Sequence, residues 1–90
     1  MSQTHLEVTY RQGQAFAAYL RLPRPRGAKV AATREVTPSI LADVDASGQL
    51  LGLELLAPQT TTAAEVQAVL AQFHAAGVAD RDLMPLRMAS

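Results

Sequence analysis

The acidic residues between positions 43 and 54 have the types and spacing of an EF-hand calcium loop. Asp43, Asp45, Ser47, Gly48 and Glu54 match positions one, three, five, six and twelve of such a loop. In an EF-hand, a helix on each side holds these oxygens so that they converge on one calcium ion. The same residues also fit a β-hairpin, in which two strands with alternating apolar residues meet at a turn over residues 46–48.

The flanking sequence favours the hairpin. Pro38 removes a backbone donor and biases the residue before it away from the helical region, so no entering helix fits there. After the turn, residues 51–55 place a leucine at every second position, which is the period of a half-buried strand. We therefore predict a hairpin whose turn is stabilised by local hydrogen bonds of Asp45 and Ser47, with positive φ at Gly48.

A metal-dependent or acid–base enzyme has less support. Asp43, Asp45 and Glu54 could form a cluster on the solvent-facing side of this hairpin, although polar residues are expected there in any case. His5 and His74 lie on different predicted elements, with no spacing that implies a shared metal. The chain has no cysteine, no nucleophile elbow and no glycine-rich phosphate loop. We therefore expect no enzymatic activity, no catalytic residue, no cofactor and no metal site.

A basic segment suggests nucleic-acid binding as the alternative function. Arg21, Arg24, Arg26 and Lys29 could neutralise phosphates, and Tyr19 could stack on a base. Against this, aromatic residues make up only 4% of the chain and the pI is about 6.7, far from that of a strongly basic domain. The alternative is therefore a nucleic-acid-binding or regulatory protein that uses this segment, although we expect no nucleic-acid binding near physiological salt.

The composition predicts one soluble globular domain over residues 1–90. Hydrophobic residues make up 49% of the 90 residues. A chain of this size buries only about 60–65% of its unfolded surface, so a lone monomer is expected to be marginally stable. We find no apolar leader and no apolar run of about 20 residues, so we expect a cytoplasmic protein without a membrane segment. Seven arginines against one lysine favour a bacterial source.

Apolar alternation predicts a sheet of four strands. Residues 5–22 form a first hairpin around Gln12 and Gly13, and prolines and Gly27 end its second strand. A third strand runs from about residue 29 to 44, with a bulge or break at Pro38, and a fourth covers about 49–56. The sheet thus spans about residues 5–57.

A helix and an arm follow the sheet. Thr62 and Glu65 form a capping box that predicts a helix over about 62–76, with Gly77 as its C-cap. Its apolar stripe should pack on the sheet. The arm, residues 78–90, is apolar enough to pack on its own domain or on a neighbour. The predicted fold class is α+β, a four-stranded antiparallel sheet of two hairpins followed by one C-terminal amphipathic helix.

The sequence from about residue 6 to 57 resembles a family of short prokaryotic proteins with a domain of unknown function. The pattern of that family is a tyrosine, an acidic turn and Leu-Tyr-Ile-Arg-Leu, followed later by Val-Asp-x-Asp-x-x-Gly-x-Leu-Val-Gly-Ile-Glu-Ile-Leu. Tyr10 and residues 18–22, 33–36 and 43–56 carry the resemblance. It implies a small antiparallel sheet and brings no established activity.

Three segments depart from the family pattern. The first turn, residues 11–15, lacks the usual acids and is about one residue longer, and a Pro-Gly is replaced by Pro38-Ser39. Residues 60–90 extend beyond the pattern.

We predict a non-enzymatic protein-interaction module that self-associates as a homodimer, with an unidentified protein as a further partner. A single helix covers only one face of a sheet, and an exposed apolar patch usually marks an interface. The residues predicted at that interface come from the second sheet face and from the arm: Leu41, Leu50, Leu56, Leu83, Met84 and Leu86.

Overall fold

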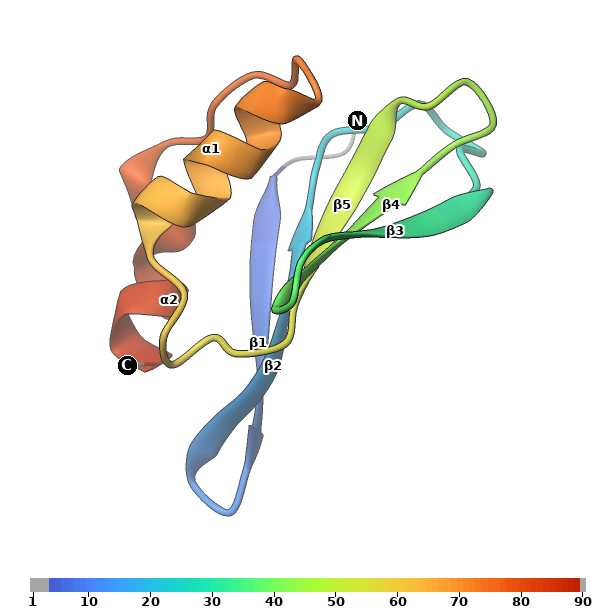
Figure 1. The fold of residues 1–90 in the computed structure, drawn as a ribbon. Helices are drawn as coiled ribbons and strands as arrows, with labels where there is room; N and C mark the ends of the chain where they lie inside the picture. The colour runs from blue at the N-terminus through green and yellow to red at the C-terminus, as the bar shows by residue number, and fades with distance from the viewer. Residues whose placement is uncertain (1–3, 90) are drawn as a thin grey trace.

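The computed structural model describes residues 4–89, so residues 1–3 and 90, including the end of the predicted arm, lie outside the described part. The elements are β1 (His5–Arg11), β2 (Gln14–Arg21), β3 (Ala32–Thr37), β4 (Ile40–Val44), β5 (Leu50–Leu55), α1 (Ala63–Gln72), the 3₁₀ helix η1 (Asp80–Leu83) and α2 (Met84–Ala89). The strands form one antiparallel sheet in the order β1-β2-β5-β4-β3, and the helices cover one of its faces (Figure 1). No described helix is both long and apolar enough to cross a membrane.

The α+β class and the antiparallel sheet are confirmed, but the sheet has five strands rather than four. The predicted third strand is in fact two strands, β3 and β4, which turn back on each other at Pro38 and Ser39. Proline has the fixed φ that the first central position of a tight turn requires. The Thr37 hydroxyl accepts a hydrogen bond from the Ser39 amide at 3.2 Å, which further stabilises the turn.

The first hairpin forms where the sequence predicts it. Gln12 and Gly13 both have positive φ, 53° and 78°, as a two-residue type I′ turn requires. Tyr10 of β1 pairs with Ala15, so Phe16 is an extra residue on β2. The end of this hairpin extends past the helices (Figure 1).

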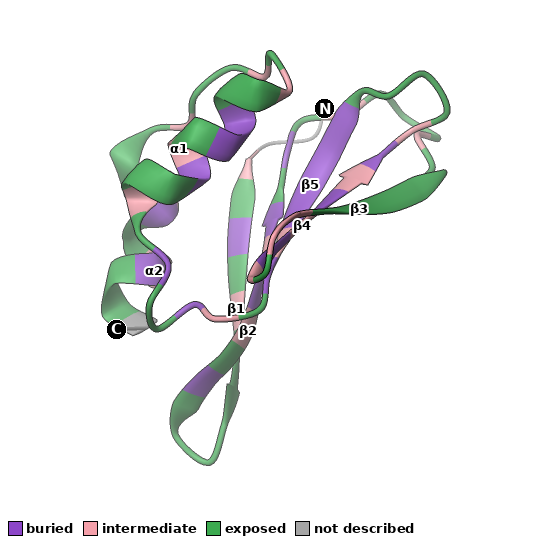
Figure 2. Cartoon of the chain, in the orientation of Figure 1, coloured by how far each residue is buried: buried purple, intermediate pink, exposed green. Residues whose placement is uncertain are grey.

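The core lies between the sheet and the helices. Buried residues alternate along β4, whereas residues 50–53 of β5 are all buried (Figure 2). Most of the buried apolar residues of the sheet and the helices form one core cluster. The cluster comprises Leu6, Ala18, Leu20, Leu22, Ile40, Ala42, Val44, Leu50, Leu53, Leu55, Val66, Val69, Leu70, Leu83 and Leu86. By contrast, β3 contains no buried residue and lies at the sheet edge away from the helices (Figures 1 and 2).

The capping box at the start of α1 is confirmed, but the predicted end of the helix is wrong. The helix stops at Gln72 rather than near residue 76, and His74, not Gly77, takes the left-handed conformation with φ 57°. The amides of His74 and Ala75 donate to the carbonyls of Ala71 and Leu70, both at 3.0 Å. This is the Schellman hydrogen-bond pattern, which satisfies carbonyls that the helix end leaves unpaired.

The C-terminal arm packs on its own domain and contains the second α-helix that the sequence analysis missed. Leu83 and Leu86 are each 2% exposed in the core, and α2 contacts β1 and β2. Pro85 is compatible with this helix because it is the second residue of α2, within the first turn, where a missing amide disrupts no helical hydrogen bond.

Candidate functional site

The sheet face away from the helices carries a hydrogen-bonded group that we call the Tyr19–Asp43 network: Tyr19, Arg24, Thr33 and Asp43. Tyr19 on β2 donates from its hydroxyl to Oδ2 of Asp43 on β4, at 2.9 Å. The Thr33 hydroxyl on β3 donates to Oδ1 of the same carboxylate, at 2.7 Å. Because β5 lies between β2 and β4, the network ties four neighbouring strands together across one face.

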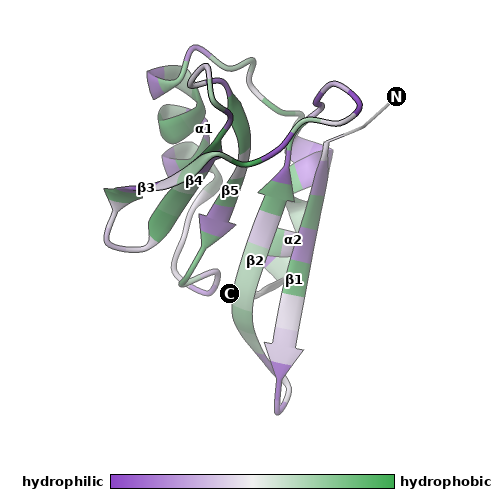
Figure 3. Cartoon of the chain, turned by 90° about the vertical axis from the view of Figure 1, so that its right-hand side faces the viewer, coloured by the Kyte–Doolittle hydropathy of each residue, from purple (hydrophilic) through white to green (hydrophobic). Residues whose placement is uncertain are grey.

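Arg24 connects this network to the segment between β2 and β3. That segment, residues 22–31, must cross from β2 to the far edge of the sheet, and it passes along the face away from the helices (Figures 1 and 3). Nη2 of Arg24 donates to the carbonyl oxygen of Leu51 at 2.8 Å and to the Tyr19 hydroxyl at 3.5 Å. The network therefore holds the crossing segment against β5.

Gly52 creates the space for the Tyr19 ring. Tyr19 is paired with Glu54, and Gly52 lies two residues along β5, at the diagonal position that a long aromatic side chain reaches. A Cβ atom on Gly52 would overlap the Tyr19 hydroxyl and lie 2.8 Å from its Cε2 atom. Glycine inside a strand often marks such a close approach, and here it leaves room for the Tyr19 ring.

The electrostatics of the network favour a neutral tyrosine. Burial is the largest cause that raises the pKa of Tyr19 above its ordinary value, and it outweighs the opposing effect of the hydrogen bond from Arg24. The Asp43 carboxylate, which accepts the hydroxyl proton, raises this pKa further. A tyrosine that acts as a base or nucleophile needs the opposite shift. The arrangement thus suits a hydrogen-bond donor that positions strands.

The hairpin prediction for residues 40–56 is confirmed, and the EF-hand interpretation is wrong because strands rather than helices flank the loop. Oδ1 of Asp45 accepts hydrogen bonds from the Ser47 amide at 2.9 Å, the Ser47 hydroxyl at 2.7 Å and the Gln49 amide at 2.9 Å. The Ser47 hydroxyl is the largest cause that lowers the pKa of Asp45. Gly48 has the predicted positive φ, 89°.

The less supported alternative, a metal-binding cluster of Asp43, Asp45 and Glu54, does not form among the described residues. Asp43 belongs to the network, Asp45 caps the turn, and Glu54 pairs with Leu41 and Tyr19. Among residues 4–89, no three acidic, histidine or cysteine side chains are placed to share a metal ion. The predicted role of Asp45 in the turn is confirmed by its hydrogen bonds there.

The four predicted basic residues do not form one patch of equivalent side chains. Arg24 is partly buried in the network, whereas Arg26 and Lys29 are exposed on the crossing segment. Arg21 is exposed on β2, opposite Gly52. Their contact with nucleic acid stays a prediction.

Three of the six predicted interface residues are buried inside the chain itself. Leu50, Leu83 and Leu86 are at most 5% exposed in the core. Leu50 is buried because a register shift after Asp43 pairs it with Val44 and reverses the side-chain alternation predicted for this stretch. The other three are accessible: Leu41 is half-buried, and Leu56 and Met84 are 46% and 48% exposed. A dimer interface at these residues stays a prediction.

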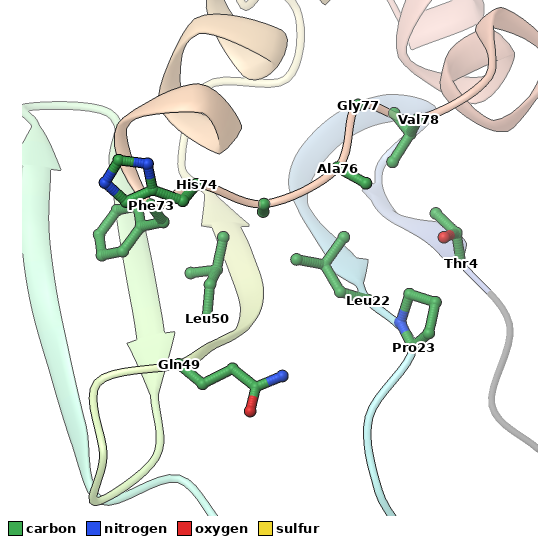
Figure 4. Close-up of a pocket in the computed structure, with 11 residues that line it drawn as sticks. Thr4, Leu22, Pro23, Gln49, Leu50, Phe73, His74, Ala76, Gly77 and Val78 are labelled. Atoms are coloured by element: carbon green, nitrogen blue, oxygen red, sulfur yellow. The ribbon is translucent and has the colours of Figure 1, made fainter.

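A cleft of about 500 Å³ lies between the end of α1 and the sheet. Figure 4 shows Phe73 and His74 on one side of it and Leu22, Pro23 and Thr4 on the other. Gln67 holds the segment after α1 in place, since its amide nitrogen donates to the Val78 carbonyl at 2.8 Å and its oxygen accepts from the Val78 amide at 3.2 Å. Most of the lining residues are apolar, and none of them is an aspartate, glutamate, lysine or arginine.

The sequence analysis missed the Tyr19–Asp43 network, although one signal was present. Gly52 interrupts a run of leucines in a predicted strand, and an interior glycine indicates that another group comes close. The identity of that group depends on which residues of β2, β3 and β4 stand beside β5. The sequence does not give this register.

Comparison with known proteins identifies one family for the part of the chain that holds the network. No curated protein and no solved structure matches the chain. The predicted resemblance to a family of unknown function is confirmed from β2 to β5, and the match leaves out β1 and all three helices. Over residues 14–57, the chain is similar to the family described as protein of unknown function (DUF2283).

Proposed function

We propose that this protein is a non-enzymatic protein-interaction module that self-associates as a homodimer. The observation that carries the proposal is the pair of open sheet edges. Within residues 4–89, β1 pairs only with β2, and β3 pairs only with β4. The outer edge of such a strand presents unpaired amides and carbonyls, which a strand of another chain can pair with.

The non-enzymatic part of the proposal is supported by the way the polar side chains are used. The hydrogen bond between Tyr19 and Asp43 holds strands together. Asp45 accepts hydrogen bonds from backbone amides of its turn, and Glu65 accepts one from the Thr62 amide at the start of α1. Each of these groups already contributes to the fold. A catalytic group must instead be free to exchange protons or bonds with a substrate.

The distribution of exposed apolar side chains supports self-association. Tyr10 and Phe16 are 53% and 52% exposed on the first hairpin, and Met88 is 77% exposed on α2. The helix α2 contacts β1 and β2 and lies behind them in the view of Figure 3. Exposed apolar surface is therefore present near the β1 edge, where burial between two copies would stabilise both.

Sedimentation equilibrium across the micromolar range tests this function. We expect a monomer–dimer equilibrium and a melting temperature that rises with protein concentration, because only the associated form buries the second surface. A monomer at every concentration, with a constant melting temperature, would contradict the proposal. Salt-sensitive binding of generic DNA or RNA by that monomer would favour the nucleic-acid-binding alternative.

A further inference from the structure

We infer that two copies pair through their β1 strands, antiparallel and centred on Thr9, so that one continuous sheet runs through the dimer. This inference rests on the proposed self-association and specifies its surface and register. It begins from the side-chain directions on β1. Val8 pairs with Ala18, which is a core residue on the side of the sheet that the helices cover. Glu7 pairs with Tyr19 on the opposite face, which carries the Tyr19–Asp43 network and which we call the network face. Because directions alternate along a strand, Tyr10 shares the helix side with Val8.

The charges on the other side of β1 follow from the same alternation. Thr9 and Arg11 share the network face with Glu7. All three side chains are exposed. The two faces of β1 therefore offer different contacts to a second copy, apolar on the helix side and charged on the network side.

Two-fold symmetry restricts the register of such a pair. The two-fold axis is perpendicular to the sheet and passes between one residue of β1 and the same residue of the second copy. We name the register by that central residue. Residues at equal distances before and after it then face each other, on the same face of the sheet. Centring on Glu7 places two carboxylates directly opposite each other, which is unfavourable. Centring on Val8 places Leu6 opposite Tyr10, although Leu6 is only 5% exposed and has little left to bury.

Centring on Thr9 is the register in which both faces are complementary. Glu7 of each copy then lies opposite Arg11 of the other, so two ion pairs form on the network face. Val8 of each copy lies opposite Tyr10 of the other on the helix side, where Tyr10 is 53% exposed. Opposite charges and aromatic–β-branched pairs both stabilise directly facing positions.

The other open edge is less suited to pairing. The extra residue of the β3–β4 bulge, Val36, is on β3 itself, which bends the exposed edge. In the first hairpin the extra residue, Phe16, is on the inner strand β2, so β1 has no insertion. Two-fold pairing centred on Arg34 or on Glu35 would also place like charges opposite each other.

Disulfide trapping tests the register directly, because the chain contains no cysteine. The Thr9→Cys variant is oxidised with oxidised glutathione, with Val8→Cys as the matched control one residue away. In the inferred register the two Thr9 positions face each other with Cβ atoms about 5 Å apart, whereas the Val8 positions are diagonal, at about 7–8 Å. We expect rapid covalent dimerisation of Thr9→Cys and slow cross-linking of Val8→Cys. Preferential cross-linking of Val8→Cys would overturn the register.

Charge reversal tests the same contact without a cross-link. Arg11→Glu places like charges opposite each other twice per dimer, and we expect the dissociation constant to rise about tenfold. The double variant Glu7→Arg/Arg11→Glu restores both pairs and should return the affinity close to that of the parent. Arg34→Glu on β3 is the control and should leave the affinity unchanged. Circular dichroism checks that each variant folds, since Arg11 also lies 4.2 Å from the Phe16 ring centroid.

The outcomes separate this inference from the proposed function. A parent protein that is monomeric at all concentrations contradicts both. A dimer that neither cross-links at Thr9 nor weakens on Arg11→Glu contradicts only the β1 interface. Weakening by Arg34→Glu instead would assign the contact to β3 and overturn the inference.

Discussion

Replacing Gly52 by alanine is expected to destabilise the fold, because the new Cβ would occupy the space of the Tyr19 hydroxyl. Tyr19 would have to move and would lose its hydrogen bond to Asp43. Overpacking costs about 1–3 kcal/mol. A hydrogen bond to a charged acceptor contributes about 1.5–3 kcal/mol.

Two effects reduce the expected loss of folding free energy. Tyr19 is only partly buried, so we take the low end of each range, a loss of about 2.5 kcal/mol in total. Alanine by itself stabilises a strand by about 0.5–1 kcal/mol relative to glycine. The net loss is then about 1.5–2 kcal/mol, which lowers the melting temperature of a chain of this size by about 6–16 °C.

A double-mutant cycle separates the overlap from other effects of the substitution. In a Tyr19→Ala background the ring is absent, so Gly52→Ala should stabilise the protein by about 0.5–1 kcal/mol. The sign of the effect thus depends on Tyr19. Urea unfolding of the four proteins, followed by circular dichroism, measures each free energy of unfolding. An equal loss of stability in both backgrounds would refute the role assigned to Gly52.

Three further predictions concern a turn, a helix end and the crossing segment. The lowered pKa of Asp45 stabilises the folded state above the unfolded pKa of about 3.9, and this stability is lost as the pH falls through the lower folded value. Asp45→Asn should therefore flatten the acid limb of a stability–pH curve, and an unchanged limb would contradict this. His74→Gly relieves a positive φ in a non-glycine residue and should raise the free energy of unfolding by about 1 kcal/mol, whereas a lower value would contradict the assigned cap. Arg26→Ala/Lys29→Ala should leave oligonucleotide titrations unchanged near physiological salt, because we expect no sub-micromolar binding by the parent protein.

Local patterns predicted most of the elements. The turn at Gln12 and Gly13, the capping box at Thr62 and the turn at Asp45 each depend on residues close in sequence, and all three form as expected. Pro38 was recognised as an interruption. Whether the chain continues past such a proline or reverses depends on how the flanking strands pair in the sheet. Here β3 and β4 pair with each other, so the chain reverses.

Features that depend on contacts between distant residues could not be predicted in this way. The register shift after Asp43 places Leu50 in the core, although its position in the alternation indicated the opposite face. His74 takes a conformation that usually favours glycine, because α1 ends there and Ala75 closes the Schellman pattern. The Tyr19–Asp43 network joins residues 24 positions apart and requires the register of β2, β5 and β4.

The most direct test of self-association through β1 is an isotope-filtered NOE experiment on a mixture of labelled and unlabelled protein. Only contacts between different copies give signals in this experiment. At millimolar concentration even a weak dimer is populated, and we predict intermolecular NOEs between Val8 of one copy and Tyr10 of the other. Intermolecular NOEs confined to other strands, or none at all, would contradict the account.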